Sequence, residues 1–280
     1  MIRQAGPEDA EDLAAFVSFE FYVHRHLDWR SVIDWLNHQP YWVIERGERL
    51  AAALAMPADP PGVHWIRLFA CTTLLDPERA FRNLFEASLE QLNGSTSGRI
   101  FTALAMHQWF AKVLEANGFF HYQDIVTLQW ERQPLPPRPE AQGLHIRPML
   151  PADLPAVADL DQQSFEQIWQ LSFDTLSLAY SQASYSTVGE LDGQLVAYQI
   201  SSENPLSAHL ARIAVHPSLQ GKHIGYSILK DLVTHFVREG LWQITVNTQH
   251  NNRASLALYQ STGFELTSER YPVFQYHSSE

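Results

Sequence analysis

Hydrophobic and polar positions follow the same order twice along this chain of 280 residues. In each half the pattern predicts a strand, helices, a hairpin, a strand, a helix, a further strand, a helix and apolar terminal strands. The first helices fall at about 10–16 and 154–160, and the terminal strands at about 122–130 and 271–276. This order favours an α/β fold with a mixed sheet in each half.

Short sequence matches support an internal duplication, because they recur at a nearly constant offset of about 145 residues. The matching segments are 2–9 with 146–153, 45–50 with 190–195, 64–67 with 209–212, and 117–119 with 262–264. Between the halves, residues 133–139 contain four prolines, which exclude a helix or a central strand and favour a stiff extended linker. The sequence therefore predicts domains at 1–132 and 144–280, joined by a linker at 133–143.

Bulk composition narrows the class of protein further. The formal net charge of −12 argues against binding to duplex nucleic acid and favours cationic partners such as amines. The N-terminus has no basic region followed by an apolar one, and the apolar stretch at 50–56 is too short to cross a bilayer, so a cytoplasmic protein is expected. Cys71 is a lone cysteine in an apolar segment, which predicts a buried strand and no internal disulfide, and the 13 histidines show no metal-ligand spacing.

Candidate chemistry concentrates after an apolar strand that ends at Val215. The loop Gln220-Gly221-Lys222-His223-Ile224-Gly225 follows, and an amphipathic helix then continues to about Val237. Glycines let a backbone approach a ligand closely, and the free N–H groups of a helix start attract an anion such as pyrophosphate. An ordinary loop before an ordinary helix is the alternative.

A second polar segment runs from Asn252 through Ser255 and Tyr259 to Gly263-Phe264. The spacing places Asn252, Ser255 and Tyr259 on one face of a helix, where their polar groups could line a ligand. A single predicted strand, at 241–248, separates this helix from the glycine loop.

These two segments, in this order, resemble the Gcn5-related N-acetyltransferase (GNAT) superfamily. Gln220 and Gly225 match its Q/R-x-x-G-x-G/A loop, with His223 in place of the middle glycine, and the second segment matches its N-x-x-A/S-x-x-L-Y-x-x-x-G-F helix. The resemblance covers about 135 residues of the C-terminal half. It implies that acetyl-coenzyme A binds there without a metal, with its pantetheine between two splayed parallel strands.

The resemblance also assigns roles to residues. The expected coenzyme-binding residues are Ile213, Ala214, Val215, Gln220, Gly221, Lys222, His223, Ile224, Gly225, Tyr226, Asn252 and Ser255. A backbone N–H within 213–215 is expected to stabilise the oxyanion, and Tyr259 to protonate the departing thiolate, unless it is a packing tyrosine. Phe165 and Trp169 lie in the family's variable helices and are candidate substrate contacts.

The general base is less well marked by the sequence. Ribosomal-protein acetyltransferases of the family place a glutamate twelve residues before the tyrosine, but this chain has Asn247, and an amide cannot act as a base. His209 lies near the place of the base in histone-type members, yet His64 matches it in the first half, which favours a structural role. Glu190 and Glu203 are further candidates.

The N-terminal half resembles a degenerate GNAT domain. Opposite the glycine loop it has Pro77 and acidic residues but no glycine, and Leu114 stands opposite Tyr259. The sequence thus predicts two tandem GNAT-like domains and an acyltransferase that acetylates a primary amine of a small molecule. The alternatives are a protein or peptide N-terminus as acceptor, and a module that binds acyl-CoA without turnover.

Overall fold

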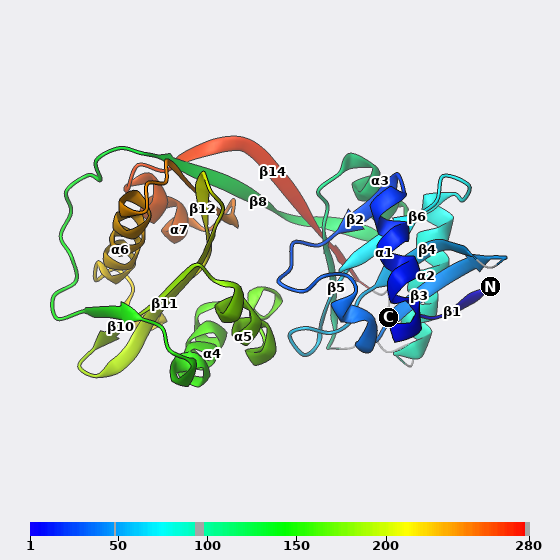
Figure 1. The fold of residues 1–280 in the computed structure, drawn as a ribbon, viewed down its shortest axis with the longest axis horizontal. Helices are drawn as coiled ribbons and strands as arrows, with labels where there is room; N and C mark the ends of the chain where they lie inside the picture. The colour runs from blue at the N-terminus through cyan, green and yellow to red at the C-terminus, as the bar shows by residue number, and fades with distance from the viewer. Residues whose placement is uncertain (48, 93–97, 278–280) are drawn as a thin grey trace. The chain divides into compact units, whose positions relative to one another are not determined.

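The computed structural model describes residues 1–47, 49–92 and 98–277, and the chain divides into two compact units (Figure 1). Unit 1 comprises Met1–Gln123 and the described part of Tyr271–Glu280, and unit 2 comprises Asp124–Arg270. Glu48, in the turn of the first predicted hairpin, lies outside the described residues. Both units combine helices with mixed sheets, as the sequence predicts.

Unit 1 contains a five-stranded sheet in the order β1-β3-β4-β6-β2 and a parallel pair of β5 with β7. Its strands are β1 (Ile2–Gln4), β2 (Tyr22–Arg25), β3 (Tyr41–Arg46), β4 (Arg49–Ala55), β5 (Val63–Trp65), β6 (Leu68–Cys71) and β7 (Ile100–Leu104). Its helices are α1 (Ala10–Phe19), α2 (Pro77–Gln91) and α3 (Gln108–Ala116), with 3-10 turns at Pro7–Asp9 and Asp34–Asn37. Cys71 is buried in β6, which raises the pKa of its thiol to about 12.

Unit 2 is built on strands in the order β9-β10-β11-β12-β13, followed by part of β8. Its strands are β9 (His145–Pro148), β10 (Tyr185–Leu191), β11 (Gln194–Glu203), β12 (Ser207–Val215) and β13 (Gln243–Gln249). Its helices are α4 (Leu154–Ser164), α5 (Phe173–Gln182), α6 (Ile224–Arg238) and α7 (Arg253–Gln260), with 3-10 turns at Pro151–Asp153, Gln167–Trp169 and Pro217–Leu219.

Helices cover both faces of the unit 2 sheet. Successive residues of β11 point to opposite faces: Ala197 packs against Ile228 of α6, whereas the Tyr198 hydroxyl donates to Asp161 of α4. The two faces therefore hold different elements, with α6 on one and α4 on the other.

Two long strands pass from one unit to the other and shift the predicted boundaries. Residues 125–131 of β8 (Phe119–Glu131) pair with β13 in unit 2, and residues 273–276 of β14 (Glu265–Tyr276) pair with β7 in unit 1. The division therefore falls after Gln123 and after Arg270, rather than at 133–143 as the sequence predicts. The proline-rich stretch indicates an extended segment. It does not show which strands pair, and strand pairing determines to which unit a residue belongs.

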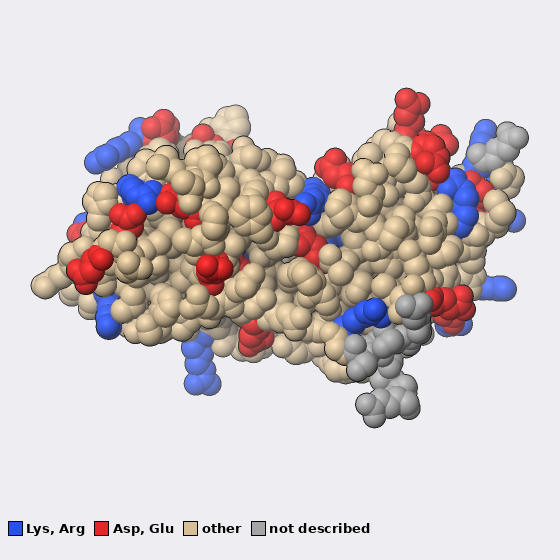
Figure 2. All heavy atoms as spheres, turned by 90° about the horizontal axis from the view of Figure 1, so that it is seen from below, with Lys and Arg blue, Asp and Glu red and all other residues tan. Residues whose placement is uncertain are grey.

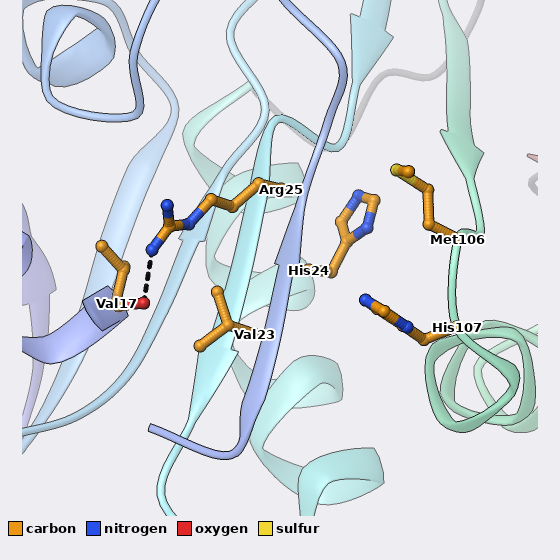
Figure 3. Close-up of a pocket in the computed structure, with 6 residues that line it drawn as sticks. All are labelled: Val17, Val23, His24, Arg25, Met106 and His107. Carbon is orange, nitrogen blue, oxygen red and sulfur yellow. Dashed lines mark hydrogen bonds between the residues drawn. The ribbon is translucent and has the colours of Figure 1, made fainter. Parts of the chain in front are cut away.

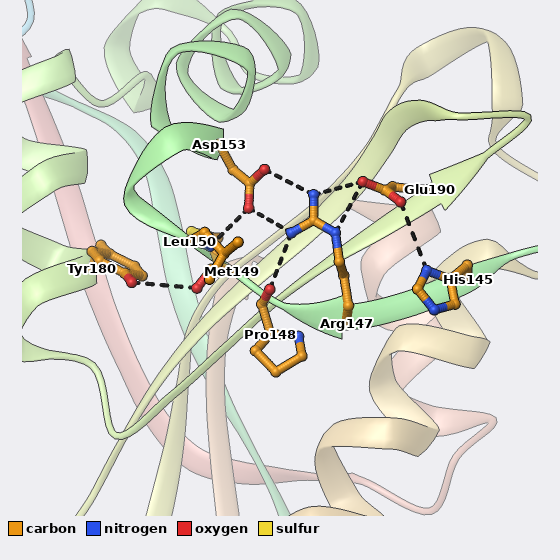
Figure 4. Close-up of polar contacts among 8 residues, drawn as sticks. All are labelled: His145, Arg147, Pro148, Met149, Leu150, Asp153, Tyr180 and Glu190. Carbon is orange, nitrogen blue, oxygen red and sulfur yellow. Dashed lines mark hydrogen bonds and ion pairs between the residues drawn. The ribbon is translucent and has the colours of Figure 1, made fainter.

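Equivalent ion-pair clusters in the two units follow from the sequence repeat. In unit 1, Arg3 Nη2 lies 2.6 Å from both Asp9 Oδ1 and Glu45 Oε1. In unit 2, Arg147 lies 2.7 Å from Asp153 and 2.6 Å from Glu190 (Figure 4). Hydrogen bonds from each arginine hold the pKa of Asp9 and of Asp153 below its ordinary value. Glu190 thus holds β10 to β9 through its ion pair with Arg147.

Figure 2 shows acidic and basic side chains interspersed over one face of the molecule. Among the described residues drawn there, Lys and Arg form no broad tract of the kind that binds duplex nucleic acid.

Candidate functional site

The two central strands of unit 2, β12 and β13, are parallel and pair at one end, but they diverge toward the other end. β12 and β13 pair only over residues 207–210 and 243–246. Beyond that point β12 stays paired with β11, and β13 with β8 from Asn247 onward. A bulge starts the separation, because Arg212 stands opposite Ile200 and Leu210 opposite Ser201, which leaves Ala211 as the extra residue. Ile213, Ala214 and Val215 therefore present one unpaired backbone edge.

The loop after β12 brings a helix start to the same end of the sheet. Gly221 and His223 have positive φ angles of 78° and 63°, and the first main-chain bond of α6 joins Ser227 N to His223 O at 3.0 Å. No main-chain acceptor within the described chain takes the N–H groups of residues 221–226. Six successive amides at a helix N-terminus form the arrangement that binds phosphates.

The left-handed conformation of His223 explains why glycine is usual at this position. A non-glycine residue there carries strain, of order 1–2 kcal/mol, so the replacement is accommodated at a cost rather than excluded. Gly225 has a packing reason, since an added Cβ would lie 3.2 Å from Leu258 Cδ2 on α7 and 3.7 Å from Val215 Cγ2.

The other predicted coenzyme residues have mixed surroundings. Lys222 is exposed, and Ile224 is buried in the core. The Gln220 side chain donates to Val215 O at 3.3 Å, and the Tyr226 hydroxyl donates to Pro136 O of the linker at 3.1 Å. Gln220 and Tyr226 thus have protein partners for their polar side-chain groups, whereas the backbone N–H groups of the loop have no main-chain acceptor among the described residues.

Asn252 acts as the N-cap of α7. Its Oδ1 accepts from Ser255 N at 3.1 Å, and its amide nitrogen donates to Gln249 Oε1 at 3.3 Å. The cap fixes where α7 begins and hence where Tyr259 lies, two turns later. This local role accounts for the Asn252–Ser255 spacing without a ligand, and Ser255 itself is half-buried.

Tyr259 is buried near the separated strands, with 3% of its surface exposed. Its ring packs at 5.7 Å from Phe264, and burial raises the pKa of its phenol above the ordinary value, partly offset by Arg212. Its hydroxyl has no hydrogen-bond partner among the described residues. The phenol is therefore protonated at neutral pH and has a proton to donate.

The two histidines that match in the repeat have different partners. His209 Nδ1 lies 2.9 Å from Oγ1 of Thr245, its partner on β13, one residue before the pairing of the two strands ends, and burial lowers the pKa of His209. His64 Nδ1 instead lies 2.8 Å from Met56 O, and its ring stacks on Phe101. The match between His209 and His64 in the repeat is therefore not explained by a structural contact that both histidines make.

Asn247 is the first residue of β13 that no longer pairs with β12, although it still pairs with β8 on the other side. Its Oδ1 accepts from Thr127 Oγ1 of β8 at 2.9 Å. The amide thus joins β13 to β8 and supplies no basic group.

A buried charge network lies on the α4 face of the sheet, and sequence reasoning missed it. Asp161 is fully buried and accepts from Arg212 Nε at 2.8 Å, from Leu171 N at 2.9 Å and from the Tyr198 hydroxyl. Burial raises the pKa of Tyr198. The sequence signal that could have pointed to this network is the match of residues 64–67 with 209–212, which aligns Arg67 with Arg212. Arg67 is likewise buried, and it pairs with Asp28 at 3.0 Å.

The predicted substrate residues lie around this arginine. The Arg212 guanidinium sits 3.5 Å from the Phe165 ring centroid, and its Nη2 donates to Trp169 O at 2.6 Å. Both aromatic side chains are half-buried. Arg212 therefore ties the segment between α4 and α5 to the strand that bears the open edge.

In unit 1 the corresponding edge is closed by the chain itself. β5 pairs with β7, the strand breaks at Ile66, and β6 then pairs on one side with β4 and on the other with β2. The helix start is closed as well, because Asp76 caps α2 by accepting from Glu78 N at 3.2 Å and Pro77 lacks an N–H. Unit 1 therefore lacks both the open strand edge and the run of successive free amides that unit 2 presents.

Comparison with known proteins identifies the class. The sequence profile of the acetyltransferase (GNAT) family matches residues 154–264. N-alpha-acetyltransferase RimI of Mycobacterium tuberculosis is 30% identical over 132 residues, which cover 45% of this chain and 81% of that protein. The chain therefore belongs to the GNAT family, whose N-acetyltransferases use acetyl-CoA.

Two further comparisons extend over the whole chain. An uncharacterized protein of Mycobacterium leprae is 28% identical over 255 residues, covering 86% of this chain, which spans 65% of that protein's length. A tandem GNAT protein from the clavulanic acid biosynthesis pathway has the same fold, with a TM-score of 0.67 at 15% identity, covering 100% of this chain and 99% of that one. The tandem GNAT architecture predicted from the repeat is confirmed.

Within residues 1–47, 49–92 and 98–277, no helix has the length and apolar character that a membrane span needs. No group of three or more His, Cys, Asp and Glu side chains in the same ranges could hold a metal ion.

Proposed function

We propose that unit 2 binds acetyl-CoA and transfers its acetyl group to a primary amine of a small molecule by direct attack. The observation that carries the proposal is the joint position of the open β12 edge and the six free amides of residues 221–226. The residues present fit the coenzyme, because the amides suit its phosphates and the strand edge suits the amide groups of pantetheine.

Each group of the chain then has a defined role. Bound acetyl-CoA supplies a thioester carbonyl and a thiolate leaving group. Backbone N–H groups of residues 213–215 stabilise negative charge on the carbonyl oxygen. The Tyr259 phenol, which burial keeps protonated, donates a proton to the leaving sulfur. His209, which burial keeps neutral at pH 7, accepts the proton of the amine directly or through water.

The acceptor is proposed to lie against Phe165 and Trp169. These half-buried aromatic residues are held at the β12 strand by Arg212 and offer an apolar wall beside the open edge. Such a wall suits the carbon skeleton of a small amine.

A peptide N-terminus is the second candidate acceptor, favoured by the similarity to N-alpha-acetyltransferase RimI. Thiol release from acetyl-CoA separates the two acceptors when small primary amines are compared with peptides of varied N-terminal residue. We expect release with small amines and background with peptides. Release with peptides alone would reverse the choice of acceptor, and background with every amine would leave a module that binds acyl-CoA without turnover.

The pH profile tests the role of His209. Because burial lowers its pKa below 6.5, the imidazole is neutral above that pH and loses its basicity only as the pH falls through the lowered value. We expect kcat/KM to be flat from pH 6.5 to neutrality. At lower pH it should fall, as the His209 imidazole becomes protonated. In His209→Gln this limb should disappear and the rate should fall by about 10²-fold. An unchanged profile in the variant would remove His209 from the mechanism.

A further inference from the structure

His209 and Thr245 lie side by side on one face of the unit 2 sheet. The two residues are partners in the parallel pairing of β12 with β13, so their side chains point to the same face. The residues that flank them in the two strands pack into the core with α6; they are Ala208, Leu210, Ile244 and Val246. His209 and Thr245 therefore lie on the opposite face, where Arg212 of β12 reaches Asp161 of α4.

Thr245 has two polar contacts, and only one position of its hydroxyl hydrogen makes both of them hydrogen bonds. Its Oγ1 lies 2.9 Å from His209 Nδ1 and 3.4 Å from Ala208 O. A carbonyl oxygen can only accept, so the hydroxyl donates to Ala208 O and its oxygen accepts from Nδ1–H. If the hydroxyl donated to Nδ1 instead, no hydrogen would lie between Oγ1 and Ala208 O.

This arrangement leaves a lone pair on Nε2 of the neutral His209 imidazole, because the hydrogen bond at one ring nitrogen sets the state of the other. Nε2 has no hydrogen-bond partner among the described residues. His209 is half-buried, and its Nε2 is not enclosed by the protein. A substrate amine or a water molecule can therefore reach this lone pair.

His24 of unit 1 shows the opposite arrangement. It lines a cavity beside β2 (Figure 3), and its Nε2 lies 3.2 Å from Ile66 O, so Nε2 carries the hydrogen. Its Nδ1 is buried and has no partner among the described residues, and burial lowers the pKa of His24 to about 3. The lone pair of His24 is thus enclosed, whereas that of His209 is open.

The side chains beside His209 across the sheet are uncharged; they are Ser202 of β11, Thr245 of β13 and, one strand further, Gln129 of β8. Two charged residues of the neighbouring strand segments share this face. Arg212 pairs with Asp161 of α4, and Glu131 of β8 accepts from the Gln129 amide. Burial, rather than a charge, lowers the pKa of His209.

We propose that Thr245 is a positioning residue for His209: its hydroxyl holds the imidazole in the Nδ1–H form and keeps Nε2 free for the proton of the amine. This role rests on the proposed acetyl transfer. There the amine nitrogen gives a proton to Nε2 and forms a bond to the thioester carbon. The carbon–sulfur bond breaks, and the sulfur takes the proton of Tyr259. An imidazole with its hydrogen on Nε2 could not accept the amine proton at that atom.

The tautomer of His209 can be measured without catalysis. Side-chain ¹⁵N signals of the full chain, recorded where the ring is neutral, distinguish the two forms, and His209→Gln assigns them by their loss. We expect the Nδ1–H form to dominate in the wild type and in Thr245→Ser, which keeps the hydroxyl. It should lose its dominance in Thr245→Val, which keeps the shape of the side chain. A dominant Nε2–H form in the wild type would overturn the proposal.

Thr127→Val is the matched control for this measurement. It removes a hydroxyl that donates to Asn247 Oδ1 at 2.9 Å, also between two neighbouring strands of the sheet. The variant should leave the His209 tautomer as in the wild type. An equal change in Thr127→Val and Thr245→Val would contradict a specific role of Thr245. If Thr245→Val does not fold, the wild-type tautomer and the kinetics of Thr245→Ser decide.

Kinetics test the role of Thr245 in the reaction. Thr245→Val should lower kcat about tenfold, as expected for the loss of one hydrogen bond, with the KM for acetyl-CoA unchanged. Thr245→Ser should keep most of the wild-type kcat. The acid limb of kcat/KM should move to lower pH in Thr245→Val, because the imidazolium loses an acceptor for Nδ1–H.

Two kinetic outcomes separate this role from the proposed function. A wild-type kcat and acid limb in Thr245→Val, or a tenfold loss in Thr245→Ser, would overturn the role of Thr245 and leave the acetyl transfer in place. Background thiol release by the wild type with every amine would overturn the acetyl transfer and with it this role, even where the Nδ1–H form is found.

Discussion

Replacing Tyr259 by phenylalanine should lower kcat for acetyl transfer by about 10²–10⁴-fold, the usual contribution of a positioned proton donor. The ring of the variant keeps its packing against Phe264, and the wild-type hydroxyl has no protein partner among the described residues to lose. The fold and the Kd for acetyl-CoA should therefore be nearly unchanged. Steady-state thiol release and calorimetry measure the two quantities.

Tyr185→Phe is the matched control. Its hydroxyl donates to Asp231 Oδ2 at 2.8 Å, and its ring stacks on His235, away from the open edge. This variant should lose one hydrogen bond and keep its kcat. Equal rates for wild type and Tyr259→Phe would make Tyr259 a packing residue and would remove the proposed acid.

Removing the buried carboxylate of Asp161 should cost unit 2 about 3–5 kcal/mol of stability, because Arg212 would then be left without its buried partner. Asp161 is fully buried and also accepts from Leu171 N, which fixes the segment that carries Trp169. The midpoint of chemical unfolding of Asp161→Ala measures the loss.

Asp153→Ala offers the comparison, since the Arg147 side chain of that pair is 26% exposed, against 14% for Arg212, and Asp153 is not fully buried. Its loss should be closer to 1 kcal/mol, as for solvent-accessible pairs. The double variant Asp161→Leu with Arg212→Met should recover much of the stability, because no unpaired charge remains. Equal losses for Asp161→Ala and Asp153→Ala would show that burial does not set the cost.

Local patterns in the sequence predicted the elements well. The repeat placed equivalent strands and helices, and the glycine loop indicated the start of α6, because turn chemistry and helical periodicity are carried by neighbouring residues. The Arg3 and Arg147 ion pairs lie within the matched segments, but only the structure shows them. His223 departs from the family's loop, and its positive φ angle shows why glycine is usual at this position.

Long-range pairing was not predictable in the same way. The crossing of β8 and β14 between the units, and the closure of the β6 edge by β2, depend on which strand edges meet rather than on alternation within a strand. The Asp161 network joins residues 51 positions apart, and an aspartate within an amphipathic helix looks like a surface residue until the fold buries it. Coenzyme-binding and catalytic roles stay predictions.

The central claim is that the amides of residues 221–226 bind the phosphates of the coenzyme beside the open edge of β12. A crystal structure of the full chain with coenzyme A tests it directly. The claim predicts phosphate oxygens about 3 Å from these amides and the sulfur next to the Tyr259 hydroxyl. Coenzyme A bound elsewhere, with the start of α6 facing only solvent, would contradict it.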